Sequence, residues 1–120
     1  MSAETELYDA LTAAAPVAAL VGVRVYPDLV PQEQALPAIG YARLTTEPIT
    51  TIHSSAPVME RVTLEVACMA STRTGADALA DVASVALGAS GFRASDRRAE
   101  IDPEHQFAAT VLTVIRLTTP

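Results

Sequence analysis

Residues that could do chemistry are few and scattered in this sequence. The only imidazoles are His53 and His105, which lie far apart in the chain. The string Asp102-Pro103-Glu104-His105 places carboxylates and an imidazole together, and these are ligand types that bind zinc. The same string is typical of a polar turn, and no second ligand motif accompanies it. We therefore expect neither a metal site nor a cofactor.

The sequence also lacks a motif for a catalytic nucleophile and a suitable acid–base pair. Ser54-Ser55 lacks the context of a nucleophile elbow, and the five glycines are too scattered to form a phosphate loop. The single cysteine, Cys68, lies on the apolar side of an alternating stretch, which is typical of a core residue. Glu60 and Glu65 fall on opposite faces of the same stretch, so they cannot act as an acid–base pair. The sequence predicts no catalytic residue and no enzyme.

Charge and hydropathy argue against two further classes of protein, those that bind DNA and those that span a membrane. The net charge is −6, and the only adjacent basic residues, Arg97 and Arg98, are surrounded by acids, so we expect no DNA binding. No apolar run approaches the ~20 residues of a membrane span. Acids near the N-terminus replace the positive charge of a signal peptide, which predicts a soluble protein that is not exported. A lone cysteine indicates a reducing compartment or a fold without disulfides.

The stretch Val58–Ala70 organises the chain. Its apolar residues alternate with polar ones, which predicts a strand with one buried face. Thirteen residues at ~3.3 Å each would span about 43 Å. A compact chain of this length should be only about 35 Å across. Unless a bulge bends it, the strand would extend beyond its own domain, which suggests a partner.

Periodicity and turn residues predict the other elements. Ser2 should cap a helix over Ala3–Ala15, and Gly22 should end a short helix over Pro16–Val21. Thr74, with Asp77 three residues later, resembles the capping box of an alanine-rich helix that Gly88 and Gly91 should end. The predicted strands are Val23–Tyr26, Ala38–Thr45, Val58–Ala70 and Phe107–Leu117, with Phe92–Ile101 either an edge strand or a loop.

These elements define the fold class. Ala38–Thr45 and Val58–Ala70 would pair as a long antiparallel hairpin, and helices on one face would cover the resulting sheet. We expect a single domain over residues 1–120. The prediction is an α+β two-layer sandwich with a mostly antiparallel sheet.

One part of the chain resembles a known family. The residues are Ala19–Pro27, then Pro31-Gln32, then Leu36-Pro37 before a strand. They resemble the phage tail-completion family, the tail terminators or tail-to-head joining proteins of long-tailed phages, prophages and gene transfer agents. The order that follows is also similar: an alternating strand, an alanine-rich helix from Gly75 and a last long strand.

The resemblance implies a virion structural protein of the tail or neck, assembled in the bacterial host cytoplasm. Such proteins form rings, typically hexamers, that cap the head-proximal end of the tail tube and join it to the head connector or stopper protein. Their partners are further copies of themselves, the tail tube protein and the connector, without a membrane. DNA only passes through the lumen. The acidic composition fits a wall on which DNA slides, and equally well an aid to solubility.

The connection Glu47–Pro57 is the main candidate for contact with a partner. It is longer than a common hairpin turn, and Ile49 and Ile52 are apolar in polar surroundings. They indicate either a docking tip or a loop that folds back over the core. The predicted interface consists of Ile49, Thr50, Thr51, Ile52, His53, Arg97 and Arg98.

A second function stays open at this point. The chain could be a small soluble ligand-binding or accessory α+β domain of a bacterium. In that case Tyr26, Tyr41 and His53 would line a pocket.

Overall fold

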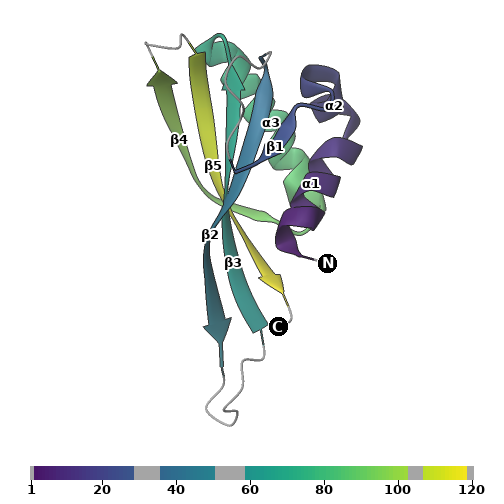
Figure 1. Cartoon of the computed structure of the whole chain (residues 1–120), viewed down its shortest axis with the longest axis vertical. Helices are drawn as coiled ribbons and strands as arrows, with labels where there is room; N and C mark the ends of the chain where they lie inside the picture. The colour runs from purple at the N-terminus through teal and green to yellow at the C-terminus, as the bar shows by residue number, and fades with distance from the viewer. Residues whose placement is uncertain (1, 29–35, 51–58, 103–106, 119–120) are drawn as a thin grey trace.

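The structure, a computed structural model, describes residues 2–28, 36–50, 59–102 and 107–118. Within these ranges the chain forms three helices and one five-stranded sheet in the order β1-β2-β3-β5-β4 (Figure 1). The short β1 runs parallel to β2, and all other neighbours are antiparallel. The predicted α+β class is confirmed. The elements are α1 (Ala3–Ala13), α2 (Ala15–Val21), β1 (Val25–Pro27), β2 (Ala38–Ile49), β3 (Met59–Ala70), α3 (Arg73–Ala89), β4 (Arg93–Asp102) and β5 (Phe107–Thr118).

Two of the predicted helix ends are confirmed. The backbone N–H of Thr5 donates to Ser2 Oγ over 3.2 Å, which caps α1. Gly22 ends α2 with a φ of 59°, a left-handed conformation that glycine adopts without strain. α1 ends earlier than predicted, because Ala14 has extended backbone angles and separates the two helices.

The predicted start of α3 is wrong by two residues. Thr72, not Thr74, is the N-cap, and its Oγ1 accepts the N–H of Gly75 over 3.0 Å. Asp77 therefore lies beyond the position of a capping box. Its carboxylate instead accepts a hydrogen bond from Thr110 of β5 over 2.7 Å, which fastens α3 to the sheet.

The hydrophobic core lies between the helices and one face of the sheet. Val62, Leu64, Val66 and Cys68 of β3 are almost completely buried there, as the alternation predicted. The alanine-rich stripe of α3 packs against them, and α1 and α2 add apolar residues at the side. Buried residues of the helices are Ala3, Leu7, Leu11, Val17, Val21, Ala76, Leu79, Ala80, Ala83 and Leu87.

Three strands run past the helices and form an arm (Figure 1). The arm consists of Thr45–Ile49 of β2, Met59–Thr63 of β3 and Ile115–Thr118 of β5. The molecule measures 52 × 29 × 21 Å, so the predicted extension beyond a compact body is confirmed.

The predicted end of β2 at Thr45 is wrong. Glu47 pairs with Arg61 and Ile49 with Met59, so these residues belong to the strand and not to the connection. A bulge between Arg43 and Thr45 shifts the register by one residue and lets pairing continue. Pro48 is tolerated because β1 does not extend along this part of β2, which leaves it an edge strand.

Two further sequence predictions concern the outer strands of the sheet, β1 and β4. β1 is Val25–Pro27 rather than Val23–Tyr26, since Val23 is 86% exposed and Val25 is buried. The ambiguous stretch Phe92–Ile101 forms most of β4 (Arg93–Asp102), an edge strand with a bulge between Ala94 and Asp96. None of the helices in the described ranges is long and apolar enough to cross a bilayer.

Candidate assembly surfaces

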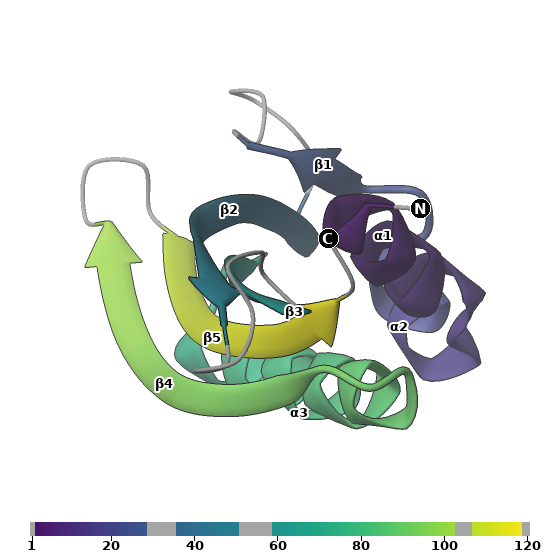
Figure 2. The ribbon, with the colours of Figure 1, turned by 90° about the horizontal axis from the view of Figure 1, so that it is seen from below.

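The sheet has a helix-covered face and an open face. Side chains alternate between the two faces along each strand. Leu64 and Val66 of β3 belong to the core, so Glu65 and Ala67, with their paired residues on β2 and β5, lie on the other face of the sheet. Figure 2 shows how strongly β4 and β5 curve as they form this surface. We call it the open face; it contains Gly40, Ala42, Glu65, Ala67, Met69, Ala109, Val111, Thr113 and Ile115.

The described part of the predicted docking tip is at the end of the arm. Ile49 is half-buried opposite Met59, and Thr50 is exposed directly after it. Thr51, Ile52 and His53 lie outside the described residues, so their role as an interface stays a prediction. Ile49 is thus the last residue of β2.

Arg97 lies on the helix-covered side of β4. Its guanidinium donates to Asp81 Oδ1 over 2.7 Å and to the Asp77 carbonyl oxygen over 3.3 Å. The hydrogen bond with Asp81 raises the pKa of Arg97, although burial opposes this effect. Arg97 therefore connects the edge strand to α3 within one chain.

Arg98 lies on the open face. It donates to Glu65 Oε2 over 3.0 Å and to Glu100 Oε1 over 3.2 Å. The pair with Glu65 crosses β5 above Val111, which is only 1% exposed although it faces away from the helices. Arg97 and Arg98 are adjacent in sequence, but the structure places them on opposite faces and not in one basic patch.

Replacing both Arg97 and Arg98 with serine should change the free energy of unfolding by about 0–1 kcal/mol per ion pair. The reason is that both side chains are near 40% exposed, where water screens the attraction. Thermal unfolding of the double variant tests this. Loss of assembly by a variant that melts normally would instead identify these arginines as a contact between subunits.

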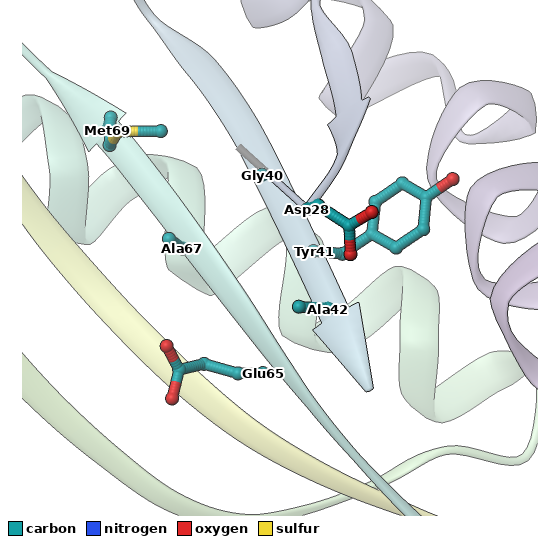
Figure 3. A pocket seen from close by; sticks show the side chains of 7 residues that line it. All are labelled: Asp28, Gly40, Tyr41, Ala42, Glu65, Ala67 and Met69. Carbon is teal, nitrogen blue, oxygen red and sulfur yellow. The ribbon is translucent and has the colours of Figure 1, made fainter. Parts of the chain in front are cut away.

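A shallow hollow of about 260 Å³ lies on the open face beside β1 (Figure 3). Small side chains of β2 and β3 form its floor, and Figure 3 shows Glu65 and Met69 extending from β3. Its charged groups are two carboxylates, with no basic residue among its lining. The lining residues are Asp28, Gly40, Tyr41, Ala42, Glu65, Ala67 and Met69.

The tyrosine pocket of the alternative hypothesis is not formed. Tyr26 pairs with Gly40, and Tyr41 is the next residue of β2, so the two tyrosine side chains lie on opposite faces of the sheet. The Tyr41 ring packs on the helix side, 6.4 Å from the ring of Tyr8. Burial raises the pKa of Tyr41, with smaller contributions from neighbouring groups. His53 lies outside the described residues.

A larger groove of about 620 Å³ runs along the open face of the arm. Its polar centre is an ion pair of Arg61 Nη1 and Glu47 Oε2 at 3.5 Å, and Arg93 lies at its side. Sequence reasoning missed this site, although the polar alternation of Arg61 and Thr63 was its signal. The lining residues are Glu47, Arg61, Thr63, Gly91, Arg93, Ile115 and Leu117.

Groups that bind metals do not gather in the part of the chain that the structure describes, where no three histidine, cysteine or acidic side chains form a cluster. Residues 103–106 lie outside that part, so the absence of a metal site at Asp102–His105 stays a prediction.

Cys68 should react with a thiol reagent only after unfolding. Its side chain is completely buried, and this burial raises the pKa of the thiol to about 12. Opening of the core is required for reaction, so labelling of the folded protein should be slower by more than about a thousandfold. Because the folded pKa exceeds the ordinary value, stability should fall as the pH rises from about 9 towards 12. Fast stoichiometric labelling of folded protein would contradict this placement.

The geometry defines a class of protein: a small α+β subunit whose sheet extends as an arm beyond its helix-covered body. A chain from the structure titled "Virion of native gene transfer agent (GTA) particle" has this fold, with a TM-score of 0.73 and 20% sequence identity. The match covers 99% of this chain and 96% of that chain. At this identity the likeness is one of fold.

The family follows from the sequence itself. Residues 5–118 match the family described as tail completion protein gp17, and the chain belongs to that family. It is therefore a structural protein of a virion tail, as the resemblance at Ala19–Pro37 implied, and it assembles with other tail proteins. No curated protein matches the sequence.

Proposed function

We propose that copies of this chain form a hexameric ring that caps the head-proximal end of the tail tube and joins it to the head connector. The protein acts by assembly and not by catalysis. The observation that carries the proposal is the arm, in which Val62 of β3 is the last residue of the core cluster and the residues beyond it extend past the helices.

The surface of the arm supports contact with another protein. Leu44, beside the arm, is 50% exposed, and Leu117 within it is 51% exposed. Neither belongs to the core cluster, whose nearest members on β3 are Val62 and Leu64. Large exposed apolar side chains on a protruding element are typical of surfaces that become buried on assembly.

The two outer edges of the sheet differ from each other, which favours a ring of head-to-tail contacts over a symmetric dimer. The β4 end presents ten residues of an edge strand, whereas the other end presents the three residues of β1 and the edge of the arm. Contact between unlike surfaces repeats head to tail, and it closes into a ring when the rotation between subunits allows it. DNA would cross the lumen, where an acidic wall does not hold phosphates.

The experiment is to measure mass in solution and binding to tail tubes. Light scattering of the purified chain, alone and with tail tube protein, should show a multimer, and electron microscopy should show a ring at one end of each tube. A chain that stays monomeric in both conditions and leaves tube ends bare would overturn the proposal.

A further inference from the structure

Arg93 differs from the other arginines in the described ranges. Six of the eight arginines form ion pairs with carboxylates of the same chain, and Arg24 donates to two carbonyl oxygens. Arg93 is exposed and has no such partner among the described residues, although it lines the arm groove. Beside it, Arg61 is only loosely paired with Glu47, and Ile115 and Leu117 are apolar.

We propose that the arm groove receives the outer surface of α1, centred on Tyr8 and Asp9, from a second copy of this chain. The inference rests on the proposed ring and names the contact between its subunits. The Asp9 carboxylate would pair with Arg93, and the Tyr8 ring would cover Ile115 and Leu117.

The positions of the two surfaces suit a head-to-tail contact. α1 is fastened to the helix-covered side of the sheet through the ion pairs Glu4–Arg43 and Glu6–Arg116. The groove lies on the open face, on the other side of the same strands. A contact between two opposite sides of a subunit leaves both surfaces free for the next copies, as a ring requires.

Asp9 is selected by elimination among the acids that have no arginine partner in the described ranges. Among the acids whose side chains the structure describes, these are Asp9, Asp28, Glu60 and Asp96. Asp28 and Asp96 lie on the same open face as the groove, and Glu60 belongs to the arm itself. Asp9 remains: it lies on α1, on the side of the sheet opposite the groove, next to Tyr8, which is 38% exposed.

The chemistry of the two surfaces is complementary. Arginine binds carboxylates through a planar fork of donors, which gives charge-assisted hydrogen bonds with a fixed geometry. Tyrosine and arginine are also the residues that most often dominate binding at the centre of an interface. The groove offers two guanidinium groups and an apolar rim, and α1 offers a carboxylate beside an aromatic ring.

Charge exchange tests the contact. Arg93→Glu and Asp9→Arg should each, alone, shift the protein from the ring to the monomer, because the groove and α1 then carry charges of the same sign. An equal mixture of the two variants should recover the ring with alternating copies, and so should the double variant. Arg73→Glu is the matched control and should keep the ring, since Arg73 is 52% exposed and pairs with Asp77 in its own helix.

The measurements are mass in solution, binding to tail tubes and a melting curve for every variant, which shows that each one folds. A wild type that never assembles overturns the proposed function and this inference together. A wild type that assembles while both single variants assemble equally well overturns the contact alone. Loss of assembly by Arg93→Glu, without recovery in the mixture, assigns the groove to another partner and overturns α1 as the occupant.

Discussion

Replacing Ile49 and Ile52 with serine should abolish capping of tail tubes, while the isolated protein melts within a few degrees of the wild type. Ile49 is half-buried at the end of the arm and packs opposite Met59, away from the core between sheet and helices. Its replacement should cost about 1 kcal/mol, which corresponds to roughly 3–5 °C for a chain of this length. Ile52 lies outside the described residues and is included because the same predicted tip contains it.

Val85→Ser is the matched control for this variant. Val85 is 75% exposed on α3, so the change removes an apolar side chain of similar size from a surface outside the arm. We expect this variant to cap tubes normally. If the arm variant instead melts more than about 10 °C lower, and its remaining folded fraction still caps tubes, the isoleucines belong to the core and docking by the tip is wrong.

The parts of the fold that the sequence predicted best are those in which one face is clearly polar. β3 alternates Val62, Leu64 and Val66 with Arg61 and Glu65, so its register toward the core follows from the pattern alone. The stripe of α3 is equally clear, and Ala76, Leu79, Ala80, Ala83 and Leu87 on it are buried.

β5 shows where the pattern stops being informative. Both faces of this strand are apolar: Leu112 and Val114 face the helices, whereas Val111 and Ile115 lie on the open face. No single-strand pattern indicates which set is the core. Val111 is nevertheless buried on the open face, where Arg98 reaches Glu65 across the strand, a contact between residues 33 positions apart.

The candidate site was predicted only in part. The extension of the hairpin could be predicted from the length of the strand. The end of β2 could not, because a bulge after Arg43 breaks the alternation and Pro48 is unusual in a strand, although pairing continues to Ile49. The groove beside the arm needed tertiary information as well. Arg93 belongs to β4, and only the pairing of Arg93 with Ile115 brings it to the arm.

Replacing Leu79 with alanine should destabilise the protein by about 2–5 kcal/mol and lower its melting temperature by roughly 8–20 °C. Leu79 lies on α3 and is completely buried in the main core cluster, so the change removes three carbons and leaves a cavity. Differential scanning calorimetry or denaturant unfolding measures the change. Val85→Ala on the same helix should alter stability by less than about 0.5 kcal/mol, because the side chain is mostly in water.

The Leu79→Ala variant also distinguishes a loss of stability from a loss of assembly. Leu79 faces the sheet, and its truncation changes neither the arm nor the groove. At a temperature well below its melting point, the Leu79→Ala protein should therefore still cap tubes, in contrast to the arm variant, which melts normally and does not cap. If Leu79→Ala loses capping while it is still fully folded, α3 transmits changes to the assembly surface, and the arm is not an independent docking element.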